Sequence, residues 1–278
     1  MFREEMENVG NTAKDKLQFF REKPAAYFLS AMLAGMFVGF GVLLAYSGGG
    51  MLNEAGVPGV KLIMGACFGV ALSLVMMAGA ELFTGNNFVM AVGVLQKKAG
   101  VRETALLWCF CWLGNLAGSV LLAVLYNLTG LGTGGVAQLI ADTAAVKMSV
   151  EAGPLFVRGI LCNILVCLAL WCGLKMKSET GKLIMIFWCL IAFFTAGFEH
   201  SIANMSLLMI SLLNPSGAAV SAGGMFYNLA VVTAGNIVGG VLFMAVPYFL
   251  ISGSSVSKGQ AAAKEEKREE KTIKKCDI

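Results

Sequence analysis

The chain has 278 residues, of which 57% are hydrophobic and 14% are charged, and its mean hydropathy is +0.75. Soluble domains carry about 25% charged residues, so the composition excludes an ordinary soluble enzyme and a disordered protein. A nucleic-acid-binding protein, which would need a basic surface, is excluded as well. Residues 1–24 and 258–278 hold 22 of the 38 Lys, Arg, Asp and Glu side chains. The weakly charged stretch between them indicates an integral membrane protein.

Three segments follow from this distribution of charge. Residues 1–24 mix both signs of charge and lack the apolar core and cleavage site of a signal peptide. We expect them to form a cytoplasmic amphipathic helix along the membrane surface. Residues 25–251 form the predicted transmembrane domain. Residues 252–278 form a charged cytoplasmic tail, which we expect to be a polar helix or disordered.

Six apolar runs in the predicted transmembrane domain are each near the ~20 residues that a helix needs to cross a bilayer. They cover residues 26–46, 61–80, 104–126, 154–174, 183–213 and 225–251. A further apolar piece, residues 84–95, is too short to span. The fifth run is too long for one untilted helix, and it contains Glu199 and His200.

The distribution of Lys and Arg between the runs predicts the orientation. With both termini in the cytoplasm, 18 of the 21 Lys and Arg residues lie on the cytoplasmic side, as the positive-inside rule requires. Lys61 and Lys147 remain on the outer side, and Arg158 lies inside the fourth run. We therefore predict a multi-pass protein of the cell membrane with both termini inside.

The two halves of the chain repeat. Residues 78–86 and 196–204 share the pattern A-G-x-E-x4-N, and residues 114–118 and 235–239 share G-N-x-x-G. Each half has three runs, an odd number, so the second half enters the membrane upside down. The sequence therefore predicts an all-α membrane protein of six transmembrane helices in two inverted three-helix repeats. This architecture is typical of channels and transporters, with the permeation site where the repeats meet.

A glutamate at the corresponding place in each half predicts an interruption of the second and fifth helices. A carboxylate inside lipid costs several kcal/mol unless it is paired or wetted. The neighbouring Thr, Ser, Gly and Asn residues let backbone leave the helix, and the freed N–H groups would favour an anion. We expect Glu81 and Glu199, with Asn86 and Asn204, to be structural residues of these breaks; pore ligands are the alternative for the two glutamates.

His200 is the single histidine, and its counterpart in the first half is Leu82. A packed core histidine is one interpretation; the other is an imidazole that holds a positive charge opposite an anion or exchanges a proton with it. Lys147 is either a surface lysine or a residue that attracts anions to the outer mouth. Asn163 and Asn115 are buried amides that could equally hold helices together. We expect no metal site and no cofactor, because the cysteines lack neighbouring histidines.

The same residues resemble the formate/nitrite transporter family, which includes hydrosulfide channels, over nearly all of residues 25–251. The resemblance is carried by Glu-Leu-Phe-Thr-Gly-Asn at 81–86, by Gly-Phe-Glu-His-Ser-Ile-Ala-Asn-Met at 197–205, and by residues 159–169. It implies an aquaporin-like protomer, a homopentamer in the lipid bilayer and one pore per protomer. In some members the N-terminal helix is a movable lid, which is the alternative to a surface anchor for residues 1–24.

The resemblance also implies roles for single residues. The family's histidine and threonine, between two hydrophobic constrictions, correspond to His200 and Thr84. Its buried asparagine corresponds to Asn163, and its lysine before the fourth span to Lys147. The residues expected at the constrictions are Phe68, Leu72, Leu82, Phe83, Val166 and Phe193.

We therefore expect a channel or transporter for small monovalent anions of weak acids, such as formate, nitrite or hydrosulfide, together with protons. A bare anion pays a large desolvation cost in an apolar constriction, whereas low dielectric favours the neutral acid. Transient protonation beside His200, through Thr84 and a water, would let the acid cross. The alternative is an aquaporin-like channel for water or glycerol, but its paired Asn-Pro-Ala loops are missing: the one Asn-Pro precedes Ser216. An enzyme is not expected.

Overall fold

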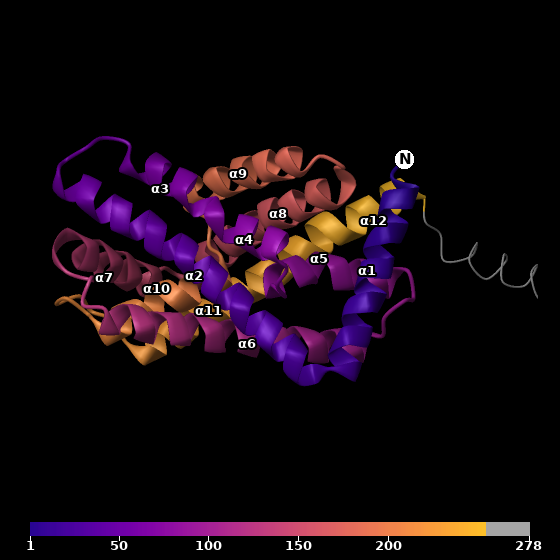
Figure 1. Ribbon diagram of the computed structural model, residues 1–278, viewed down its shortest axis with the longest axis horizontal. Helices are drawn as coiled ribbons and strands as arrows, with labels where there is room; N and C mark the ends of the chain where they lie inside the picture. The colour runs from indigo at the N-terminus through magenta and orange to yellow at the C-terminus, as the bar shows by residue number, and fades with distance from the viewer. Residues whose placement is uncertain (254–278) are drawn as a thin grey trace, which may run out of the picture.

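The computed structural model describes residues 1–253, which contain helices and no strands. Six helical segments in this part of the chain are long and apolar enough to cross a membrane, and they form an elongated bundle (Figure 1). The predicted all-α membrane fold with six spans is confirmed. Of the predicted tail, residues 254–278 lie outside the described residues.

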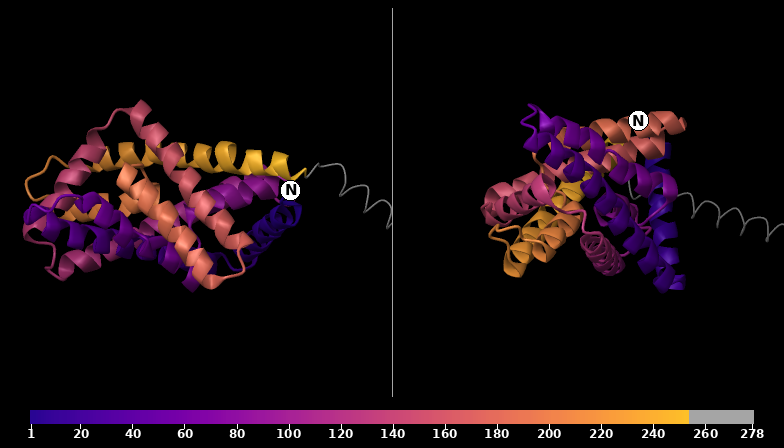
Figure 2. Two further views of the ribbon diagram at one scale, coloured as in Figure 1. Left: turned by 90° about the horizontal axis from the view of Figure 1, so that it is seen from above. Right: turned by 60° about the vertical axis from the view of Figure 1, so that its left-hand side comes forward.

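Two kinds of helix make up the bundle. The spans are α2 (Pro24–Glu54), α3 with α4 (Val60–Phe68 and Val70–Ala78), α6 (Val101–Leu128), α8 (Ala152–Lys175), α9 (Glu179–Ala196), and α11, η1 and α12 in sequence (Ala222–Val238, Gly239–Ala245 and Val246–Ser252). The shorter helices are α1 (Arg3–Glu22), α5 (Phe83–Leu95), α7 (Gly134–Ser149) and α10 (Ser201–Leu213). Figure 2 shows α11, η1 and α12 as one rod along the molecule.

The chain leaves the helical conformation twice inside the bundle, at residues 79–82 and 197–200. Each of these two breaks begins with a glycine at positive φ, 80° at Gly79 and 83° at Gly197, a conformation that glycine adopts without steric cost. The long apolar run 183–213 therefore divides between α9 and α10, and the short apolar piece 84–95 falls within α5. The predicted inverted relation of the two halves stays a prediction.

Glycines let the first and third spans of each half approach closely. A Cβ on Gly118 of α6 would overlap the Met32 carbonyl of α2, and a Cβ on Gly235 of α11 would overlap the Phe156 carbonyl of α8. Small residues at helix interfaces are how helices pack tightly in lipid. These contacts bring residues from α6 and α11 against the two breaks.

Helix α2 continues eight residues beyond the predicted run, which ended at residue 46. Its last turns pack on α3 and α7: a Cβ on Gly49 would overlap Met64, and one on Gly50 would overlap Val136. The three glycines at 48–50 are poor helix formers, so packing against neighbouring helices decides the local structure here.

Helix α1 crosses one end of the bundle, the end where the N-terminus and the last residues of α12 both lie (Figure 1). Its buried face includes Met6, Val9, Ala13 and Leu17. The Gln96 side chain donates a hydrogen bond of 2.8 Å to the Met6 carbonyl. The N-terminal segment is therefore a helix packed against protein on one face.

Candidate functional site

A cavity of about 370 Å³ opens at the end of the molecule that the predicted orientation places outside the cell. We call it the outer cavity. Its floor is formed by Phe68, Phe193 and His200, which also line a small cavity of about 10 Å³ deeper in the protein. We call these three residues the outer ring. The His200 and Phe193 rings are nearly parallel, with centroids 6.0 Å apart.

A second cavity of about 410 Å³, the inner cavity, approaches the small cavity from the opposite direction. Leu72, Leu82 and Val166 line both of them, and we call these residues the inner ring. The two rings thus enclose the small cavity between two larger ones. Phe83, also expected at a constriction, is buried at the start of α5 and is not among the residues that line the small cavity.

His200 and Thr84 lie together at the two breaks. The His200 Nε2 atom is 3.0 Å from Thr84 Oγ1, and His200 Nδ1 accepts a hydrogen bond of 3.1 Å from the Ala203 backbone N–H. A ring nitrogen that accepts carries no proton, so this network assigns the neutral tautomer with hydrogen on Nε2. His200 is therefore a hydrogen-bond donor toward the Thr84 hydroxyl.

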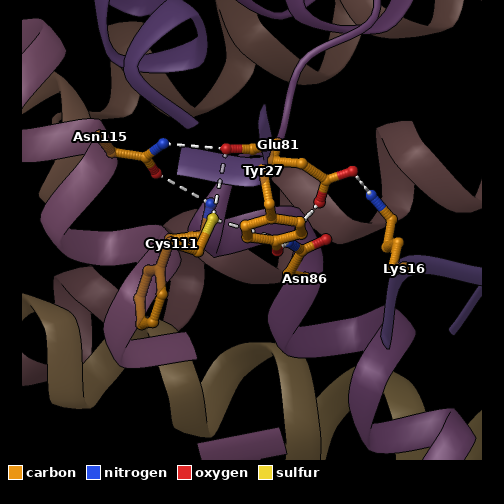
Figure 3. Close-up of polar contacts among 7 residues, drawn as sticks. Lys16, Tyr27, Glu81, Asn86, Cys111 and Asn115 are labelled. Atoms are coloured by element: carbon orange, nitrogen blue, oxygen red, sulfur yellow. Dashed lines mark hydrogen bonds and ion pairs between the residues drawn. The ribbon is translucent and has the colours of Figure 1, made fainter. Parts of the chain in front are cut away.

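The Glu81 carboxylate at the first break is fully engaged (Figure 3). Its Oε1 atom accepts from Lys16 Nζ at 2.6 Å, and Oε2 accepts from Asn86 Nδ2 at 2.9 Å and from the Tyr27 hydroxyl at 3.2 Å. Lys16 comes from α1, so the N-terminal helix supplies the cation that offsets this buried charge. These contacts meet the requirement that charges buried at membrane depth be paired.

The Glu199 carboxylate at the second break has a matching arrangement. Its Oε2 atom accepts from Lys147 Nζ at 2.6 Å and from Asn204 Nδ2 at 2.7 Å. Asn204 also donates to Asn228 of α11 at 2.8 Å. Lys147, in the last turn of α7, is thus ion-paired, with 17% of its side chain exposed.

One asparagine holds the backbone of each break. Asn115 Oδ1 accepts from the Phe83 N–H at 3.0 Å, and its Nδ2 donates to the Glu81 carbonyl at 2.9 Å. Asn236 Oδ1 accepts from the N–H of residue 201 at 2.9 Å, and its Nδ2 donates to the Glu199 carbonyl at 2.9 Å. Each asparagine therefore satisfies backbone groups left without partners at a helix start. The two asparagines thus make corresponding contacts at the two breaks, while the repeat itself stays a prediction.

Asn163 lies behind Thr84. Its Nδ2 atom is 3.2 Å from the Thr84 carbonyl, 3.2 Å from Asn87 Oδ1 and 2.7 Å from the Asn236 carbonyl. The side chain connects α8 to α5 and α11, and it is fully buried. Its contact with the predicted central residues is through the backbone of Thr84.

Most of the chain matches one family of membrane proteins. The sequence profile of that family, formate/nitrite transporter, matches residues 3–250. The chain belongs to the formate/nitrite transporter family. It is 38% identical to the nitrite transporter NirC of Salmonella typhimurium, over 92% of this chain and 94% of that protein. It is also 37% identical to a probable formate transporter of Methanothermobacter thermautotrophicus, over 79% of this chain and 86% of that protein.

Solved structures place this family member in the same fold. An FNT family ion channel is 35% identical and superposes with a TM-score of 0.85, covering 89% of this chain and 98% of that one. A pentameric formate channel with formate bound is 28% identical, with a TM-score of 0.69 over 81% of this chain and 96% of that one. These relatives are transporters and channels rather than enzymes.

Sequence reasoning missed several residues of the two breaks in this family member. Lys16 was not singled out, because it is one of ten charged residues in the segment 1–24. Tyr27 and Asn228 carry no local signal at all. Asn115 was expected to be a buried amide that could hold helices together, whereas Asn236 was not singled out, although it occupies the corresponding position in the repeated G-N-x-x-G pattern.

Proposed function

We propose that the protein conducts the small monovalent anions of weak acids, with formate, nitrite and hydrosulfide as the substrate class, and that they cross the two rings as neutral acids. The observation that carries this proposal is the small cavity between two rings that are apolar except for His200. An anion held there would pay a large desolvation cost, which its neutral acid avoids. Family membership supports this class of solute over the alternative of water or glycerol.

We propose further that the proton is exchanged beside His200. In the assigned tautomer the ring donates through Nε2, and the Thr84 hydroxyl stands next in line. The Nε2 proton passes to the Thr84 oxygen while the Thr84 hydroxyl proton passes to the anion, and Nδ1 takes up a proton from water of the outer cavity, which breaks the bond with the Ala203 N–H. His200 is left as the neutral tautomer with hydrogen on Nδ1, and the reverse transfer restores the first tautomer. Asn163 holds the Thr84 backbone in place during this exchange.

The similarity to a pentameric formate channel supports a proposal for the assembled form. We propose a homopentamer with one pore per protomer, in the cell membrane, with both termini in the cytoplasm. The protomer exposes large apolar side chains along α2 and α6, including Leu33, Phe40, Leu44, Leu106 and Leu113. Lipid or neighbouring protomers would cover this surface.

Uptake into proteoliposomes tests the proposed function. We would measure initial rates for formate, nitrite, hydrosulfide and glycerol at two pH values, with protein-free liposomes as the control. We expect saturable uptake of at least one weak-acid anion, accompanied by a pH change inside the liposomes, and glycerol uptake at the control rate. Glycerol uptake that exceeds that of all three anions would contradict the proposal and favour the neutral-solute channel.

A further inference from the structure

The two larger cavities have different charges. The charged residues that line the inner cavity are Lys16 and Glu81, which are paired with each other. The outer cavity is lined by one such pair, Lys147 with Glu199, and by three further charged residues. These are Lys61, Asp142 and Arg158. Counted over residues 1–253, the formal charge of the lining residues is therefore zero inside and +1 outside.

The Lys147–Glu199 pair contributes little field at the outer mouth, because its charges are 2.6 Å apart and cancel at a distance. Glu199 is only 4% exposed, so the lysine is needed to compensate it. Lys16 and Glu81 form a pair of the same length at the other break. Because both breaks have such an ion pair, the pairs account for the stability of the breaks. They do not account for a difference in charge between the outer and inner mouths.

Arg158 and Lys61 are the cations of the outer cavity that form no ion pair among residues 1–253. Arg158 lies at the second break, where its carbonyl accepts a hydrogen bond of 3.2 Å from the Glu199 N–H. At the first break, the Ser30 carbonyl accepts the corresponding bond of 3.3 Å from the Glu81 N–H. The repeat therefore has an uncharged serine at the inner cavity and an arginine at the outer one. Lys61 Nζ lies over the same break, 2.9 Å from where a Cβ on Gly197 would stand.

We infer that Arg158 and Lys61 form an anion-collecting site at the outer mouth, while Lys147 serves to neutralise Glu199. This inference rests on the proposed function and adds the residues that determine capture from outside. Unpaired cations in a cleft raise the local concentration of anions. A guanidinium also matches the two oxygens of a carboxylate or nitrite. The described part of the chain places no unpaired cation in the lining of the inner cavity, and we infer that capture from the cytoplasmic side does not depend on such a site.

Membrane vesicles of defined sidedness test the inference. Anion uptake would be measured in right-side-out and inverted vesicles for wild type, Lys61→Gln, Arg158→Gln and the double variant, with vesicles lacking the protein subtracted. We expect the double variant to raise the half-saturating anion concentration at the outer face roughly fivefold, the effect of two unit charges several ångströms from the anion in water. The maximal rate and the values at the inner face should not change.

Two control variants and a measurement at high salt separate capture from folding. Lys177→Gln removes the same charge on the loop between α8 and α9, and it should change nothing. Arg158→Lys keeps the charge, and it should retain most of the outer-face affinity. In about 1 M inert salt, where the screening length is only ~3 Å, the difference between wild type and the double variant should largely vanish.

Three results would overturn the inference. An unchanged outer-face affinity in the double variant would show that the two cations do not collect anions. An equal loss at both faces would show that they support the structure instead, for example by Lys61 stabilising the C-terminal end of α9. Wild-type vesicles that take up no weak-acid anion would overturn the proposed function, and the inference with it.

Discussion

Glu199 is almost fully buried, so its charge depends on Lys147. Leaving a buried carboxylate without its partner typically costs roughly 3–5 kcal/mol, whereas replacing both partners by neutral groups costs much less. The sequence left two interpretations of Lys147 open, a surface lysine and a lysine that attracts anions. The difference in cost between the single and the double replacement distinguishes both of them from a stabilising ion pair.

We therefore predict that Lys147→Met lowers the thermal midpoint of the purified assembly in detergent by several degrees. Adding Glu199→Gln should restore most of the loss, because no charge then remains buried without a partner. If the double variant is less stable than Lys147→Met, the two residues do not compensate each other and this account of the pair is wrong.

The second prediction at the scale of a residue concerns Asn236. Its side chain satisfies the backbone of the second break through Ser201 and Glu199, and it also donates to the Gly159 carbonyl at 2.8 Å. Each buried group left without a partner costs about 1–3 kcal/mol. We predict that Asn236→Leu prevents or severely weakens assembly, measured as loss of the oligomer in size-exclusion chromatography. Asn127→Leu, at an exposed position, is the control; equal behaviour of the two variants would contradict the role of Asn236.

At the scale of the elements, the positions of the two breaks could be predicted, because a glutamate and a glycine mark each of them within an apolar run. Helix α7 was not predicted. Its buried residues, Ala137, Ile140, Ala141 and Ala144, are at helical spacing, but three of the four are alanines, which give a weak hydrophobic pattern. The omission of α7 from the prediction matters, because this helix positions Lys147 beside Glu199.

The site itself could be predicted only in part. His200 and Thr84 were paired through the family resemblance, and five of the six expected constriction residues line the small cavity. The partner of Glu81 could not be derived, because Lys16 lies 65 positions away on a helix outside the spans. Ion pairs between distant segments depend on tertiary packing, which local periodicity does not encode.

At the scale of the whole molecule, α1 and the end of α12 lie at the same end of the bundle (Figure 1). An even number of spans requires this, because it returns the chain to the side of the membrane on which it began. We predict that short protease-sensitive tags at either terminus are protected in right-side-out vesicles and cleaved in inverted ones. The excess of Lys and Arg at this end gives the physical reason. A tag at the loop between α10 and α11 should behave in the opposite way. Cleavage of both terminal tags in right-side-out vesicles would reverse the proposed orientation and exchange the two mouths.

The central claim is that a weak acid crosses the two rings in its neutral form, after exchanging a proton beside His200. The most direct measurement is the initial rate of nitrite or formate uptake across a pH series by His200→Phe proteoliposomes, with Thr84→Ser as the variant that keeps the hydroxyl. The account predicts that His200→Phe nearly abolishes pH-dependent uptake while the assembly stays intact, and that Thr84→Ser retains it. Uptake by His200→Phe at the wild-type rate, with the wild-type pH profile, would contradict the account.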